Sequence, residues 1–146
     1  MSARARATRG AVALAALMAS AMSAHPAAAD PRVDYMLHCR GCHGPDGAGA
    51  PGAAPSFRGQ VGQFLGVPGG REYLIRVPGT AQSELDDART AALLNWLLHE
   101  FSASELPADF VPYDAAEVGR SRHAALVDVG AARRELLRAL ETTRSP

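Results

Sequence analysis

The chain has 146 residues, and its 15 basic and 15 acidic side chains balance to a formal net charge of zero. This balance does not favour a nucleic-acid partner, because phosphate backbones are bound through an excess of basic side chains. Apolar residues make up 47% of the chain but aromatic residues only 5%. The hydrophobic core built from side chains alone will be thin, and we expect another group to fill its centre.

Residues 1–29 have the three parts of a cleaved export signal. Three arginines within the first nine residues precede the apolar run 11–22, and small residues at 27–29 form a cleavage sequence. The run is too short to cross a bilayer, which takes about 20 residues. We therefore expect a periplasmic protein with no stable membrane span, whose mature chain begins at Asp30. An alanine-rich, low-complexity tail is the alternative interpretation.

A five-residue motif just inside the expected mature chain carries the chemistry. Residues 39–43 read Cys-Arg-Gly-Cys-His and contain both cysteines of the chain, which is the attachment sequence for c-type haem. The spacing lets the thiols of Cys39 and Cys42 each reach one vinyl group of a porphyrin, and His43 then lies under the iron. The motif predicts one haem c per chain, with two thioether bonds and one iron–imidazole bond.

Other uses of these thiols fit the sequence less well. A redox C-x-x-C motif is expected beside alternating apolar strands, and the surrounding glycine-rich sequence has none. A zinc site would need a fourth ligand beside Cys39, Cys42 and His43, for which His38 and His99 are the candidates. A disulfide across two residues is strained and closes a very short loop. Haem attachment is therefore the preferred interpretation.

Around this motif the chain resembles the small single-haem class I cytochromes c, over about residues 30–101. Tyr35 lies four residues before Cys39, where the first helix of that family carries an aromatic side chain. Asp30 and Pro31 are suited to the N-cap and first position of this helix. The resemblance implies an all-helical domain that wraps around one covalent haem.

A second point of resemblance is the segment 54–59, which is similar to the family's G-P-x-L-x-G sequence. The resemblance implies that the Pro55 carbonyl accepts a hydrogen bond from Nδ1 of His43, twelve residues earlier. That bond would fix the tautomer and leave Nε2 for the iron. Phe57 is then expected to pack against the macrocycle.

Residues 85–97 resemble the final helix of the family. Asp86 is the candidate N-cap of this helix, and Trp96 is the aromatic residue expected to meet the first helix. The segment 44–79 between the helices contains ten glycines and five prolines, which predicts loops rather than regular elements. A short helix is expected only at 71–76. Loops of this kind can fold over the two faces of a porphyrin.

The family's usual second axial ligand is missing. That ligand is a methionine in a Met-Pro sequence before the final helix, whereas this chain has methionines only at positions 1, 18, 22 and 36. Val77-Pro78 is the nearest match. We expect an open distal site on the iron, or a cap formed by His38, His99, His123, water, another side chain or a partner protein.

Residues 111–146 lie beyond the resemblance and are expected to form a helical extension. Residues 114–117 have the pattern of a capping box, and leucines at 136, 137 and 140 predict an amphipathic helix. The arginines at 133, 134 and 138 are expected to point away from these leucines. The extension either packs on the haem domain, docks a redox partner or is disordered.

These patterns predict an all-α, cytochrome c-like protein with a signal peptide at 1–29, a haem domain at 30–110 and the helical extension at 111–146. The expected function is that of a periplasmic electron carrier, not an enzyme, with redox proteins such as a dehydrogenase or an oxidase as partners. An open distal face leaves two alternatives. One is a ligand-binding sensor or weak peroxidase, and the other is a haem subunit docked on a periplasmic dehydrogenase.

Overall fold

The computed structural model describes residues 29–144, and every regular element in this range is helical. The all-α prediction is confirmed, while the export signal predicted at 1–29 falls outside the described residues except for its last position. None of the described helices is long and apolar enough to cross a membrane. The elements are α2 (Pro31–His38), α3 (Arg40–His43), α4 (Val61–Phe64), α5 (Gly70–Arg76), α6 (Pro78–Ala81), α7 (Asp87–Ser102), the 3₁₀ turn η2 (Ala103–Glu105), α8 (Ala115–Ser121) and α9 (Val129–Arg144).

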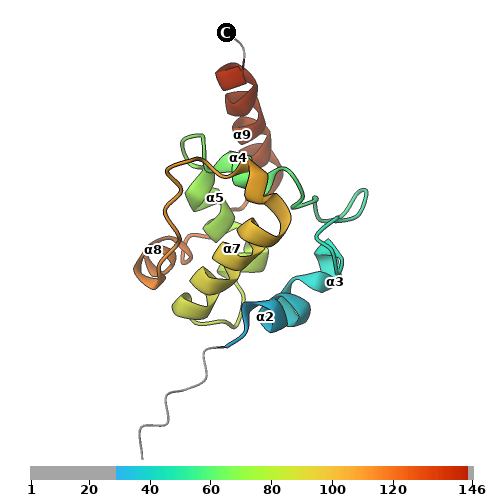
Figure 1. Ribbon diagram of the computed structural model, residues 1–146, viewed down its shortest axis with the longest axis vertical. Helices are drawn as coiled ribbons and strands as arrows, with labels where there is room; N and C mark the ends of the chain where they lie inside the picture. The colour runs from blue at the N-terminus through green and yellow to red at the C-terminus, as the bar shows by residue number, and fades with distance from the viewer. Residues whose placement is uncertain (1–28, 145–146) are drawn as a thin grey trace, which may run out of the picture.

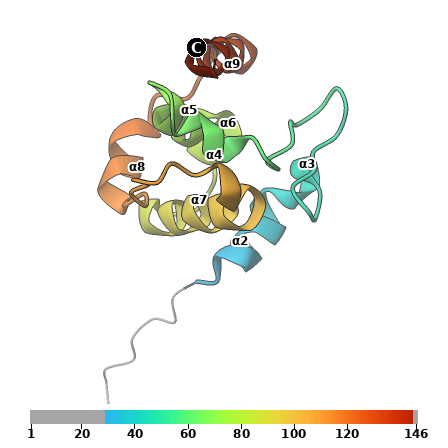
Figure 2. The same ribbon diagram turned by 45° about the horizontal axis from the view of Figure 1, so that its top comes forward.

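Helix α7 runs through the middle of the molecule (Figure 1), with α2 and α8 packed against it. Helix α9 lies at the far end of the molecule from α2, as the turned view also shows (Figure 2). The buried face of α7 contributes Leu94, Leu97 and Leu98 to the main core, which α4, α5, α8 and α9 complete. Helix α7 is therefore the central helix, against which α2, α4 and α8 pack.

Side-chain caps start three of the helices at the predicted positions. Asp30, Asp86 and Asp114 each accept a hydrogen bond from an amide two or three residues further on, at 2.9, 2.8 and 2.7 Å. These bonds satisfy amides that have no partner within the helix. The predicted starts of α2, α7 and α8 are therefore confirmed.

The first helix crosses α7 through aromatic side chains. Tyr35 is 1% exposed, and its ring centroid lies 5.4 Å from that of Trp96 and 5.2 Å from that of Phe101. Beside it the buried Asp34 pairs with Arg89 of α7 at 2.5 Å. The predicted meeting of Tyr35 and Trp96 is confirmed, and an ion pair adds to it.

The glycine-rich segment 44–79 is mostly loop, and the helix predicted at 71–76 is present as α5 with Tyr73 and Leu74 buried. Two single-turn helices, α4 and α6, were not expected. Val61 and Phe64 of α4 are buried in the main core. Tertiary packing, which overrides the weak helix propensity of a glycine-containing turn, explains α4. Helix α6 has no buried residue and begins at Pro78, a residue suited to the first helical position.

The extension is packed on the rest of the chain. Asn95 of α7 and the backbone of Tyr113 exchange two hydrogen bonds, at 2.8 and 3.0 Å. Glu117 of α8 holds Arg71 of α5 through two contacts, at 2.7 and 2.8 Å. Of the three expectations for residues 111–146, packing is therefore the one that the described contacts support.

Helix α9 is amphipathic as predicted, with Leu136 and Leu140 buried in the main core and Arg134 and Arg138 exposed. The prediction that all three arginines point away from the leucines is wrong for Arg133, which is partly buried and donates a hydrogen bond to the Gln60 side chain. The reason is helical spacing, since position 133 lies three and seven residues before the two buried leucines and so shares their face.

Arg122, which follows α8, is nearly buried at 9% exposed. Its guanidinium donates to the carbonyl oxygens of Ser83 and Leu85, at 2.8 and 2.7 Å, and pairs with Asp87 at 3.0 Å. A buried cation is stable only when it is paired and hydrogen-bonded in this way. Arg122 therefore ties the segment between α6 and α7 to the extension.

Candidate functional site

A cavity of about 560 Å³ opens between the haem-attachment motif, α7 and α9. Its volume is that of a typical small-molecule or cofactor site. Its lining, as far as the structure describes the chain, is mainly apolar and includes no aspartate or glutamate. The cavity brings together all five residues that the sequence proposed for the site, which are Cys39, Cys42, His43, Pro55 and Phe57.

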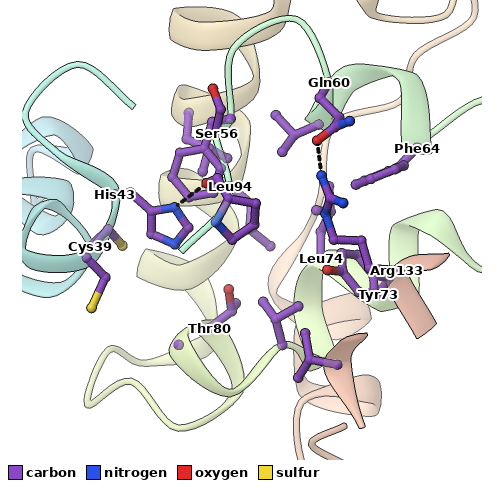
Figure 3. Close-up of a pocket in the computed structure, with 18 of the residues that line it drawn as sticks. Cys39, His43, Ser56, Gln60, Phe64, Tyr73, Leu74, Thr80, Leu94 and Arg133 are labelled. Carbon is purple, nitrogen blue, oxygen red and sulfur yellow. Dashed lines mark hydrogen bonds between the residues drawn. The ribbon is translucent and has the colours of Figure 1, made fainter. Parts of the chain in front are cut away.

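The motif forms a compact turn at the junction of α2 and α3. The amides of Cys42 and His43 donate to the Cys39 carbonyl at 3.2 and 3.0 Å, so the two thiols and the imidazole are presented by one short piece of backbone. Both thiols are free and both line the cavity (Figure 3, where Cys39 is labelled). The two cysteines are therefore not joined in a disulfide.

The environment of the thiols is not that of a redox C-x-x-C motif. Burial, with smaller contributions from the charges of Asp34 and Cys42, raises the pKa of the Cys39 thiol to about 11. Reactive redox cysteines have lowered pKa values instead. Within residues 29–144 no group of three or more His, Cys, Asp or Glu side chains is arranged to hold a metal ion, so the zinc interpretation gains no support.

The ring of His43 is oriented by the loop that follows it. Its Nδ1 lies 2.9 Å from the Pro55 carbonyl oxygen, and since that oxygen can only accept, Nδ1 carries the hydrogen. The predicted contact is present, and in the neutral imidazole it leaves Nε2 without a hydrogen. Burial lowers the pKa of His43, with the Pro55 bond acting in the opposite direction. A neutral imidazole is the form that binds a metal.

Short-range contacts fold the loop 44–56 back onto the motif. The Gly49 amide donates to the His43 carbonyl at 2.8 Å, and the Tyr35 hydroxyl donates to the Gly44 carbonyl at 2.5 Å. Gly49 has a φ of +69°, and a Cβ there would lie 2.4 Å from the Ala54 oxygen. Only glycine fits this position without strain. The tight backbone at Gly49 thereby brings Pro55 within hydrogen-bond distance of the His43 ring.

The opposite wall of the cavity comes from two separate segments. Val77, Thr80 and Ser83 line it from α6 and its flanks, and Val129 and Arg133 line it from α9. Val77-Pro78, the nearest match to the family's Met-Pro sequence, therefore lies at the cavity. Valine has no atom that can bind iron.

The other candidates for a second axial ligand differ in whether they line the cavity. His38 lines the cavity but directly precedes Cys39, on the side of the motif. His99 and His123 are not among the lining residues, and the His99 ring instead contacts Phe110 at a centroid distance of 5.7 Å. No methionine within residues 29–144 lines the cavity, because Met36 is on the outer side of α2 near Arg40.

Several polar residues of the lining were not predicted as site residues, among them Gln60 and Arg133, while Tyr73 lies on the helix predicted at 71–76 and also lines the cavity. Figure 3 shows Arg133 and Gln60 on one side of the pocket and Cys39 and His43 on the other, with a hydrogen bond from the Arg133 guanidinium to Gln60 Oε1. Burial raises the pKa of Tyr73, an effect that the nearby Arg133 opposes. The helical spacing of position 133 relative to the leucines was the signal that could have found it.

Known proteins with similar sequences bear on the identity of this site. Two proteins called cytochrome c-552, both from Thermus thermophilus, are each 34% identical to this chain over 102 residues. The matches cover 58% of this chain and 78% and 69% of the two relatives. The chain belongs to the c-type cytochromes. No protein-family model matches this cytochrome.

The residues of this cytochrome's cavity fit a covalently held haem. Two free thiols and an oriented, neutral imidazole face one mainly apolar space. These are the groups needed for two thioether bonds and one iron bond. The donor set is thus complete for one face of the iron, and the described part of the opposite wall offers no histidine, cysteine or methionine for the other face.

Proposed function

We propose that this c-type cytochrome is a periplasmic electron carrier with one haem c, attached through Cys39 and Cys42 and ligated by His43. The observation that carries this proposal is the convergence of both thiols and the Pro55-oriented imidazole on one cavity. The similarity to cytochrome c-552 supports it. The expected partners are periplasmic redox proteins.

Each of these residues has a separable role. When bound, the haem supplies the one-electron chemistry. Cys39 and Cys42 tether it, and His43 offers Nε2 to the iron while its Nδ1–H is held by Pro55. Phe57, whose ring stacks on that of His43 at a centroid distance of 3.9 Å, helps to exclude water. Exclusion of water lowers the local dielectric, which is one way a protein sets a reduction potential.

We further propose that the distal face of the iron has no protein ligand. The support is the lining of the opposite wall, which contains Val77, the nearest sequence match to the family's methionine, with Thr80 and Ser83 as neighbouring polar groups. A methionine ligand raises the reduction potential of a haem, so the potential of this protein is expected to be lower than in methionine-ligated relatives. The proposed open face also favours a second function, the binding of a small neutral ligand, and the apolar lining beside Val77 supports it.

Three parts of the chain are proposed to have separate roles. Residues 1–29 are proposed to direct export, residues 30–110 to form the haem domain, and residues 111–146 to be an extension packed on it. The contacts of Tyr113, Glu117 and Arg122 with the haem domain support packing rather than a detached docking element.

A potentiometric titration of the purified protein, followed by carbon monoxide addition, tests both the electron-carrier function and the open distal face. The haem absorption should titrate reversibly as a one-electron couple, and the reduced protein should bind carbon monoxide rapidly and stoichiometrically. Irreversible or multi-electron behaviour would contradict the electron-carrier function. A reduced protein that refuses carbon monoxide would instead contradict only the open distal face.

A further inference from the structure

The mainly apolar cavity contains one arginine, and that arginine comes from the extension. Arg133 of α9 is partly buried and lines the cavity, and no other arginine within residues 29–144 does so. None of the ion pairs formed in that range involves it. An anionic group in the cavity would offset the hydration that this partly buried guanidinium loses, and the described lining offers no carboxylate of its own.

The position of Arg133 relative to the cysteines suggests what this partner is. Haem carries its two vinyl groups on one half of the macrocycle and its two propionate carboxylates on the other half. A haem tethered at Cys39 and Cys42 therefore turns its carboxylates away from the motif. Arg133 and Gln60 lie on the side of the pocket opposite Cys39 and His43 (Figure 3).

We infer that Arg133, with Gln60 and Tyr73, forms a binding site for a haem propionate, so that the extension contributes directly to the cofactor site. Arginine suits this role because its planar guanidinium matches a carboxylate with two parallel hydrogen bonds. The bond from Arg133 to Gln60 holds the guanidinium at the cavity wall. The Tyr73 hydroxyl and the Gln60 amide are additional donors. This inference rests on the proposed haem attachment.

The charge of Arg133 should also influence electron transfer. A positive charge next to the haem favours the reduced state, which carries one more electron. Removal of this charge should lower the reduction potential. Loss of an equal charge from an exposed position on the same helix should have little effect, because solvent and salt screen it.

The test compares three variants of the full-length holoprotein at one pH and ionic strength. Arg133→Gln removes the charge at the cavity, Arg133→Lys keeps it, and Arg134→Gln removes the charge of the adjacent, exposed arginine. Arg133→Gln should lower the equilibrium constant for reduction about tenfold, which is about 59 mV for a one-electron couple. Arg133→Lys should restore most of this difference, and Arg134→Gln should change the constant less than twofold.

Two further measurements separate the possible failures. The helical circular dichroism of each variant reports whether α9 stays folded, and intact mass reports whether haem is attached. Haem-loaded, folded Arg133→Gln protein with the potential of Arg134→Gln would overturn the propionate site but not the proposed function. A wild-type chain that carries no haem mass would overturn both.

Discussion

The two walls of the cavity are held in different ways. The turn and loop that carry the haem motif are shaped by contacts between residues close in sequence, such as Tyr35 with Gly44 and His43 with Pro55, although α2 as a whole is also anchored on α7 by the pair of Asp34 with Arg89. The opposite wall depends on distant residues, since Arg122 binds the backbone at Ser83 and Leu85 from the extension. The first wall contains the motif and the His43–Pro55 contact that the sequence resemblance predicted, and the second contains Val77, the nearest sequence match to the expected methionine.

This difference separates the residues proposed to attach the haem from those expected to set its reduction potential. Haem attachment is expected to depend on the motif and on the loop next to it, which form a locally determined unit. The stability of the distal segment and the reduction potential are expected to depend on the extension. Changes in the two walls should therefore have different kinds of effect.

The largest effect is expected from substitutions in the haem motif, which should abolish covalent haem attachment. The double substitution Cys39→Ser and Cys42→Ser removes both thioether bonds, so no haem should remain on the denatured chain. Intact mass and haem staining on a denaturing gel measure this directly. Haem that stays with the denatured double variant would contradict attachment at these residues.

Loss of Arg122 should have the next largest effect. Arg122→Met leaves the carbonyls of Ser83 and Leu85 without their donor and breaks the pair with Asp87, so the free energy of unfolding should fall by about 3 kcal/mol. Denaturant titration of the holoprotein measures this. Haem attachment should be unchanged, because the motif lies on the other wall.

The matched control for Arg122 is the exposed Arg120, on α8. Arg120→Met should change the free energy of unfolding by less than about 0.5 kcal/mol. Equal losses in the two variants would mean that the hydrogen bonds of Arg122 to the distal segment do not stabilise the fold.

A smaller effect is expected from the loop beside the motif. Gly49 and Gly52 both have positive φ, of +69° and +74°, but of these two a Cβ would clash with backbone only at Gly49. Gly52→Ala should cost about 1 kcal/mol from backbone strain alone, and Gly49→Ala about 2 kcal/mol or more because the clash is added. Unfolding titrations compare the two variants, and equal losses would contradict the tight fold of this loop.

Much of the first wall could be predicted from the sequence. The motif and the cap at Asp30 follow from spacing over a few residues, and the contact between His43 and Pro55 was implied by the family resemblance. Short-range geometry restricts such contacts strongly, and the family resemblance points to the same pairs. The roles of these residues toward haem remain predictions until the holoprotein is measured.

The second wall could not be predicted in this way. Arg122 and Arg133 look like ordinary surface arginines, because the groups that surround them come from positions 32 to 73 residues away. The single-turn helix α4 was missed for a related reason, since packing rather than local propensity forms it. For α6, Pro78 at the first helical position was a local signal. For Arg133, the helical register relative to Leu136 and Leu140 did contain a usable signal.

The absorption spectrum of the purified holoprotein, recorded oxidised and reduced, tests the central claim most directly. A covalent haem ligated by His43 without a methionine predicts c-type haem bands in the reduced state and no methionine–iron charge-transfer band in the oxidised state. A colourless protein from a host able to attach haem would contradict the cofactor assignment. A clear methionine–iron band would contradict the proposed open face.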